Sequence, residues 1–295
     1  MPARTAQLLL VLALLAAAGG AVTGCEQGSG RGAQSRVPGH SPVAEARARQ
    51  VADAWDGSEA ARAWRKGYYP IGEGVQLPEG AFHNEADKQA YGTQNFVLRG
   101  RLPALPRKNG RVKWESGGSL TLPLMETRQA YESVARGGND GPHLTVTGAK
   151  LGEMTLATSR GPATVPAWLF TLDGYDTPLK RAAVRPSKPP TPPIEPVAEG
   201  PGATLQPLQQ LVGSARDGRS VTVAAGHGAC DDGPAVDVLE TGGSVVLSAS
   251  VVGTKDGSCT RQLLSERMTV MLDRPLGDRV LLDAFTGRPV PYGRP

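Results

Sequence analysis

The side chains with the greatest potential for chemistry lie together in one short loop. His227 is closely followed by the carboxylates of Asp231 and Asp232, in the segment GHGACDDG at 226–233. A histidine beside carboxylates can act as a general base or contribute to a metal site. Glycines with an acidic pair also form an ordinary turn, and this structural interpretation is the favoured one.

One cysteine lies in this loop and another follows it in the sequence. Cys230 and Cys259 are an even pair once Cys25, discussed below, is set aside. In an exported chain such a pair favours a disulfide over free thiols. A metal site would need more ligands than the neighbourhood offers, so we predict a disulfide and no metal.

The N-terminus carries the clearest motif. Arg4 precedes an apolar run from Leu8 to Ala18, and Val22-Thr23-Gly24-Cys25 follows it. This sequence resembles the lipobox of bacterial lipoproteins, and the composition resembles that of actinobacterial surface lipoproteins. The resemblance implies that residues 1–24 are a signal peptide cleaved before Cys25. It also implies that Cys25 carries a diacylglyceryl group, with a further acyl chain, such as palmitate, on its amine.

The lipid then suffices as an anchor, because two acyl chains exceed the threshold for stable membrane binding. An uncleaved membrane-spanning anchor is the alternative, but a spanning helix needs about 20 apolar residues and this run is shorter. The expected location is the outer face of the bacterial cytoplasmic membrane.

Composition and motifs exclude several classes of function. The 32 basic and 28 acidic residues are interspersed, which does not favour a nucleic-acid partner. The common nucleophile and phosphate-binding motifs are missing, and His83 has no second histidine at zinc-protease spacing. We therefore predict no catalytic residue and no cofactor. A triad of scattered residues stays open, because such sites are recognised by geometry.

Periodicity predicts the elements. The tether at 25–41 ends at Ser41-Pro42, where the serine hydroxyl is expected to cap a helix. This helix covers 43–64 and breaks at Asp56-Gly57-Ser58; further helices are expected at 126–134 and 205–215. Alternating runs predict strands at 95–98, 112–115, 119–124, 143–147, 154–158, 163–172, 221–224, 235–240, 244–252, 267–272, 279–282 and 288–292.

The expected fold class is α+β, mostly β, with two small β-rich domains that are each preceded by helix. Residues 42–185 form the first domain and 204–295 the second, which carries the disulfide. The linker at 186–203 begins with the proline-rich segment 186–196, expected to be an extended spacer. Trp114 and Trp168, on predicted strands, are expected in the core.

The two halves show a possible internal duplication. Gly117-Gly118-Ser119 matches Gly242-Gly243-Ser244, and similar matches recur at a nearly constant offset. They pair Leu151-Gly152-Glu153 with Leu276-Gly277-Asp278, Gly161 with Gly287, and Val165-Pro166 with Val290-Pro291. Common ancestry predicts the same strand order in both halves.

The leading hypothesis is a lipid-anchored lipoprotein of the cell envelope with a non-catalytic binding or structural role. Its expected partners are the membrane, through the N-terminal lipid, and an envelope protein or cell-wall component. The alternative is a secreted hydrolase with a dispersed active site, which would show a close histidine and carboxylate in a deep pocket.

Overall fold

The computed structural model describes residues 41–106, 108–198, 205–253, 259–260 and 262–292. The lipobox with Cys25 and the tether before Ser41 lie outside these residues. Val37–Pro295 forms one compact unit by its contacts, so the predicted domain boundaries stay a prediction. Among the described helices, none is long and apolar enough to span a membrane.

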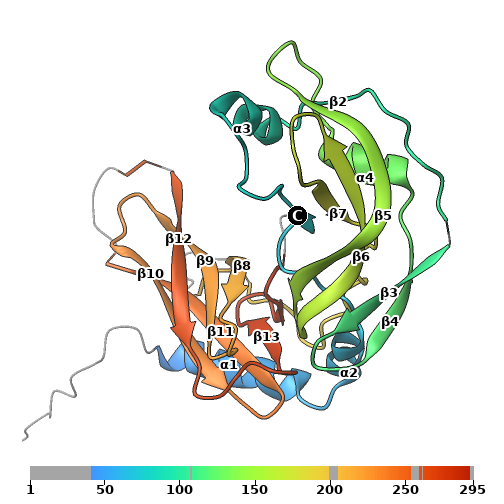
Figure 1. Ribbon diagram of the computed structural model, residues 1–295. Coiled ribbons are helices and arrows are strands. Elements are labelled where there is room, and N and C mark those ends of the chain that lie inside the picture. Colours follow the sequence, from blue (N-terminus) through green and yellow to red (C-terminus); the bar gives the residue numbers. More distant parts are fainter. Residues whose placement is uncertain (1–40, 107, 199–204, 254–258, 261, 293–295) are drawn as a thin grey trace, which may run out of the picture. The chain divides into compact units, whose positions relative to one another are not determined.

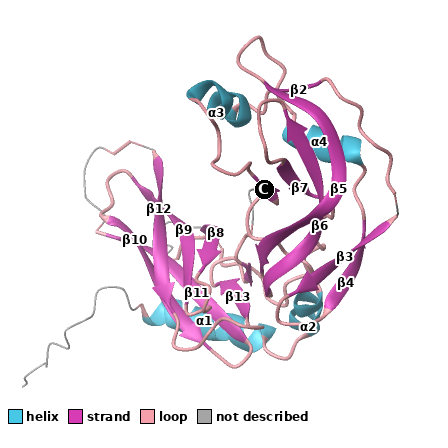
Figure 2. Cartoon of the chain, in the orientation of Figure 1, coloured by secondary structure: helices cyan, strands magenta, loops and turns pink. Residues whose placement is uncertain are grey.

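Strands dominate the chain, as Figure 2 shows, and the fold is α+β and mostly β as predicted. The described helices are α1 Pro42–Trp55, α2 Glu59–Lys66, α3 Glu85–Gly92 and α4 Thr127–Val134. The predicted break at 56–58 separates α1 from α2, where the Ser58 hydroxyl caps α2 by accepting from the Ala61 N–H. Ser41 is the N-cap of α1 and Pro42 its first residue, as predicted, but the Ser41 hydroxyl makes no side-chain capping bond, so that part of the prediction was wrong.

One sheet is formed by the strands between α2 and the proline-rich segment. They are β1 Val75–Gln76, β2 Phe96–Leu98, β3 Asn109–Trp114, β4 Ser119–Pro123, β5 Leu144–Thr158, β6 Gly161–Leu172 and β7 Leu179–Ala182. The long hairpin of β5 and β6 is its centre, with β2 on the far side of β5 and both β3 and β7 bonded to β6. Trp114 and Trp168 are buried in its core as predicted.

The strands after the proline-rich segment form two further sheets. Four strands, in the order β10-β11-β13-β14, make the first sheet, and three, in the order β12-β9-β8, make the second. Their bounds are β8 Leu208–Ser214, β9 Ser220–Gly228, β10 Gly233–Glu240, β11 Ser244–Val252, β12 Leu263–Met271, β13 Val280–Asp283 and β14 Arg288–Pro289. Apolar side chains of both sheets share one core.

Helix α1 packs on β11 and β10, and α1 and α2 share the core of these later strands (Figure 1). This explains the burial of β11, in which every residue from Ser244 to Ala249 is buried. A strand covered on both faces needs apolar residues at consecutive positions, and Val245, Val246 and Leu247 supply them. The first helices therefore pack on strands that are distant in sequence.

The helix predicted at 205–215 was wrong, because this segment forms β8. Leu208 and Leu211 are both buried, at the spacing of a helix. The pairing of β8 with β9 shifts register twice, between Leu208 and Gln210 and between Leu211 and Gly213. Each bulge inserts a residue, so a strand can bury positions three apart.

The duplication was also wrong, because the strand pairings of the two halves differ. Gly152 lies within β5, paired with Ala167, whereas Gly277 lies in the connection between β12 and β13. The strands β5 and β6 form a hairpin, whereas β12 and β13 belong to different sheets. The shared glycines therefore do not mark a shared topology.

The linker, which begins with the proline-rich segment, forms neither helix nor strand over its described residues 186–198. It is attached to the fold at both ends: Ser187 donates its N–H to Tyr68, and Val197 donates to Phe285, each at 2.8 Å. Ile194 also packs against the later core. The segment therefore follows the surface of the folded unit.

Candidate functional site

His227 lies near the end of β9 and continues its buried face, with 5% of its surface exposed. Its Nδ1 is 2.9 Å from the carbonyl oxygen of Gly228. Its Nε2 is 3.0 Å from a carboxylate oxygen of Glu266, on the adjacent strand β12, but without the alignment of a hydrogen bond. The carboxylate near this ring is therefore one that the local sequence pattern did not indicate.

The two predicted carboxylates, Asp231 and Asp232, lie in the turn between β9 and β10. Asp231 accepts the Gly228 N–H at 2.6 Å, which closes the turn. The carboxylate of Asp232 lies so close to Gly253 that a Cβ there would be 2.0 Å from it. Within the described residues, no three His, Cys, Asp or Glu side chains form a group that could hold a metal ion.

The predicted disulfide between Cys230 and Cys259 is present, with the Cα atoms 5.9 Å apart. This distance lies within the usual range for a disulfide. The bond ties the turn after β9 to the segment before β12. Together with the Asp231 contact, it braces the connection at 229–232 between β9 and β10.

His83 is exposed and stacks on Tyr175, with ring centroids 4.2 Å apart. It directly precedes Asn84, whose side chain caps α3 by accepting the Asp87 N–H at 2.9 Å. The Tyr175 hydroxyl donates to Asp87 at 2.6 Å. These contacts attach α3 to the loop after β6 and bring no second histidine to His83 within the described part of the chain.

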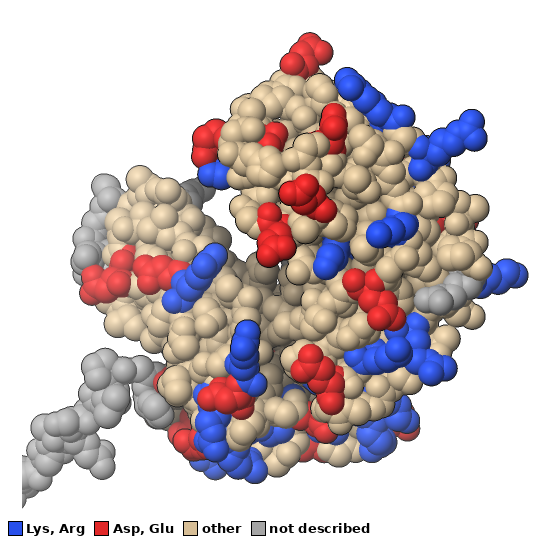
Figure 3. All heavy atoms as spheres, in the orientation of Figure 1, with Lys and Arg blue, Asp and Glu red and all other residues tan. Residues whose placement is uncertain are grey.

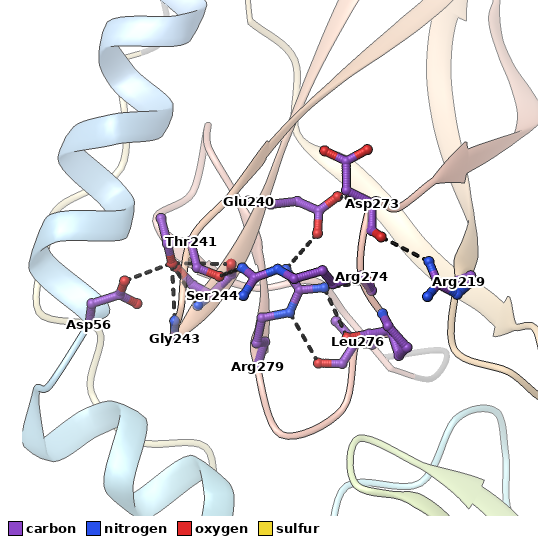
Figure 4. Close-up of polar contacts among 11 residues, drawn as sticks. Asp56, Arg219, Glu240, Thr241, Gly243, Ser244, Asp273, Arg274, Leu276 and Arg279 are labelled. Atoms are coloured by element: carbon purple, nitrogen blue, oxygen red, sulfur yellow. Dashed lines mark hydrogen bonds and ion pairs between the residues drawn. The ribbon is translucent and has the colours of Figure 1, made fainter.

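The most enclosed charge cluster surrounds Arg279, which is 8% exposed (Figure 4). Its guanidinium donates to Glu240 at 2.6 Å and to the carbonyls of Arg274, Pro275 and Leu276. Desolvation by itself would raise the pKa of Glu240. The hydrogen bonds from Arg279 and from backbone N–H groups outweigh it and hold that pKa below its ordinary value. Every guanidinium nitrogen of Arg279 has a partner, so this cluster fastens a loop and leaves nothing for a ligand.

A groove with a volume of about 1150 Å³ is the strongest candidate for a binding site. Residues from α2, α3, α4, β7, β14 and the proline-rich segment line it. On one part, Trp64 stacks on Tyr69, with centroids 3.7 Å apart, and Tyr292 lies 5.4 Å from Trp64. Prolines of the segment 186–192 extend this apolar lining.

The charged side chains of the groove are mostly basic. Arg136, Arg181 and Arg288 line it, and Glu73 is the single carboxylate among the described lining residues. Elsewhere, basic and acidic side chains are interspersed over the face drawn in Figure 3. The described lining also contains no histidine and no cysteine. The described lining of the groove thus presents aromatic and cationic surfaces to a ligand.

Backbone strain occurs at the rim of this groove. Gln94 adopts a left-handed conformation with φ of 55°, which non-glycine residues rarely adopt. Its N–H donates to Tyr91, and its carbonyl accepts the N–H of Gly137. This residue therefore joins the end of α3 to the end of α4, beside Arg136, and such strain is common at functional sites.

Sequence reasoning did not find this groove. Its residues are spread from Trp64 to Tyr292, and its arginines have no local pattern that distinguishes them from solvated ones. Comparison of the chain with protein-family models, with curated proteins and with solved structures finds no match. The argument for function therefore depends on the residues themselves.

Proposed function

We propose that this chain is a lipid-anchored lipoprotein of the bacterial cell envelope, whose folded part is a non-catalytic module that binds a ligand in the groove. The sequence from Leu8 to Cys25 supports the anchor, through its resemblance to a lipoprotein signal peptide. The tether before Ser41 is expected to let the folded unit extend away from the membrane surface. The expected location is the outer face of the cytoplasmic membrane.

The groove is the observation that carries the binding role. Its volume of about 1150 Å³ is comparable to that of ligand sites, and it combines aromatic faces with a few charged groups. Aromatic and arginine side chains dominate binding energies at recognition surfaces. An envelope protein or cell-wall component is the expected class of partner.

The anchor is tested by Cys25→Ser in cells that produce the full chain. Loss of the thiol should prevent lipidation, so the protein should move from the membrane fraction to the soluble exported fraction. A variant that stays in the membrane pellet after a high-salt wash, as fully as the unchanged protein, would contradict the anchor. The test is independent of the groove.

Binding is tested by blocking the groove at Gly92, an exposed lining residue where a new Cβ meets nothing within 4 Å. Gly92→Trp should reduce co-sedimentation of the full chain with purified cell-wall material, or its cross-linking to envelope proteins. Gly138→Trp is the matched control, because Gly138 is equally exposed and open but does not line the groove. Equal association of both variants would contradict binding in the groove.

A secreted hydrolase is the second candidate, favoured only by the contact between His227 and Glu266. A catalytic histidine needs a nucleophile or a water within reach. Among the described residues, the only hydrogen bond of the His227 ring is to the carbonyl of Gly228, and His227 does not line the groove. Any hydrolytic activity of the purified chain should therefore survive His227→Ala.

A further inference from the structure

The groove contains an arginine that is positioned but not neutralised. Arg181, on β7, donates from Nε to the Ser133 hydroxyl at 2.9 Å and from Nη1 to the carbonyls of Glu73 and Gly74, at 3.0 and 3.3 Å. These acceptors are uncharged, and they hold the guanidinium in one place. No carboxylate oxygen of the described residues comes within ion-pair distance of it, and its Nη2 has no hydrogen-bond partner among them.

The surroundings of Arg181 disfavour the charged form of its guanidinium. Burial lowers the pKa of Arg181, and the neighbouring cation Arg136 lowers it further, while Tyr68 and Glu73 act in the opposite direction. Buried charges in proteins are usually paired, because desolvation of an unpaired ion is unfavourable. The buried guanidinium of Arg279, whose role is structural, is bonded to one carboxylate and to three carbonyls. Arg181 lacks such a carboxylate.

A second polar group beside Arg181 is also incomplete. The hydroxyl of Tyr68 is buried and has no hydrogen-bond partner among the described residues. Burial raises the pKa of Tyr68 to about 12, and the charge of Arg181 acts against that rise. An unsatisfied buried hydroxyl is rare in native proteins and calls for an explanation such as an absent ion. Tyr68 is not among the residues that line the groove, so Arg181 is the group that a ligand in the groove can reach.

We infer that the groove binds an anionic group of its ligand, a carboxylate or a phosphate ester, through Arg181 and Arg136. An oxyanion at this place supplies the negative charge that the two guanidinium groups lack. The planar arginine fork matches the geometry of both groups. The aromatic and proline surfaces then contact the apolar body of the same ligand. This inference rests on the proposed function, because it names the chemistry of what that groove binds.

The experiment is a calorimetric titration of the full chain, purified in mild detergent, with three probes. Benzoate carries a carboxylate on a phenyl ring, and phenyl phosphate carries a phosphate ester on a phenyl ring. Benzyl alcohol has the same ring without a charge. At least one anion should bind ten times more tightly than the alcohol. The tighter of the two anions identifies the source of the charge.

Three variants assign the binding to these arginines. Arg136→Gln and Arg181→Gln should each weaken binding of the preferred anion at least tenfold. Arg128→Gln, which removes the same charge from an exposed position on α4 outside the groove, should bind as the unchanged chain does. Arg136 is exposed, so its variant remains informative if Arg181→Gln does not fold.

Three results would overturn the inference: equal binding of benzyl alcohol, no binding of either anion, or unchanged anion binding in Arg136→Gln. The proposed function is judged separately, by association with envelope material in Gly92→Trp and Gly138→Trp. If Gly92→Trp abolishes that association while the anion titrations fail, the groove binds a ligand without an anionic contact. Failure of both would reject the groove as a binding site.

Discussion

The indole N–H of Trp55, in the last turn of α1, donates to the carbonyl of Gly287 at 2.8 Å, although the two residues are far apart in sequence. Trp55 is fully buried, and Gly287 adopts a φ of 65° in the turn between β13 and β14. Arg47 adds a second bond from α1 to this region, from Nε to the Ala284 carbonyl at 3.0 Å. Helix α1 is thus bonded to the connection between β13 and β14.

Replacing the indole tests this attachment. Trp55→Phe keeps an aromatic ring but leaves the Gly287 carbonyl without its donor and removes buried volume, so the free energy of unfolding should fall by about 1 to 3 kcal/mol. Urea unfolding measures this change in the free energy of unfolding. Val43→Ala, at a position on α1 that is 65% exposed, should change stability by less than about 0.5 kcal/mol. Equal effects of the two changes would contradict a role for the bond.

The carboxyl group of Asp283 should make stability depend on pH. Asp283 is fully buried, and desolvation raises its pKa to about 6, although it accepts hydrogen bonds from Phe285 and Thr286. Because the pKa in the folded state exceeds the unfolded value of about 3.8, its contribution to stability is complete below pH 4 and is lost as the pH rises through 6. The loss amounts to about 3 kcal/mol.

Asp283→Asn isolates this contribution, since the amide does not titrate and all other groups remain. The free energy of unfolding of the unchanged chain, minus that of the variant, should decrease between pH 4 and pH 7. Urea unfolding at four pH values across this window gives the difference. A difference that stays constant, or that increases with pH, would show that the carboxyl group is not destabilised by burial.

The disulfide between Cys230 and Cys259 should stabilise the later sheets, because it closes a loop with a sequence separation of 29 residues. The double change Cys230→Ser and Cys259→Ser should lower the free energy of unfolding by about 3 to 4 kcal/mol in the chain-entropy model. Denaturation of both proteins without reductant provides the comparison. Free thiols at these positions in the folded, unchanged chain would contradict the bond.

Two tyrosines should respond to the same substitution with opposite sign. Tyr131 donates its hydroxyl to the Phe96 carbonyl at 3.1 Å, so Tyr131→Phe should destabilise the chain by about 1 kcal/mol. The Tyr68 hydroxyl is buried without a partner in the described structure, so Tyr68→Phe should leave stability unchanged or raise it by about 1 kcal/mol. Thermal unfolding of the two variants, without added anions, compares them. Destabilisation by Tyr68→Phe would reveal a partner of that hydroxyl.

Local patterns in the sequence predicted most elements and their class. The Asp56-Gly57-Ser58 break between two helices and the alternation in β9 depend on residues that are neighbours in the chain. Such signals act through backbone propensity and one buried face, which local residues determine. The pairing of Cys230 with Cys259 was predicted for a different reason, because the third cysteine, Cys25, was assigned to the expected lipid anchor.

Predictions from local patterns were wrong where the pairing between strands, and not the local sequence, decides the structure. Leu208 and Leu211 have the spacing of a helix, but the bulge between Leu208 and Gln210 lets a strand bury both. Gly152 and Gly277 share their neighbours in sequence, but one lies inside a long hairpin and the other in a loop between sheets. Bulges and strand order arise from the partner strand, which no local window contains.

By itself the sequence predicted the α+β class, the order of most helices and strands, and the disulfide between Cys230 and Cys259. Only the tertiary structure decided that α1 covers β11, and that Arg136 and Arg181 line the same groove. The reason is physical. Helix periodicity and turn chemistry are local, whereas the burial of a charge depends on which distant elements pack around it.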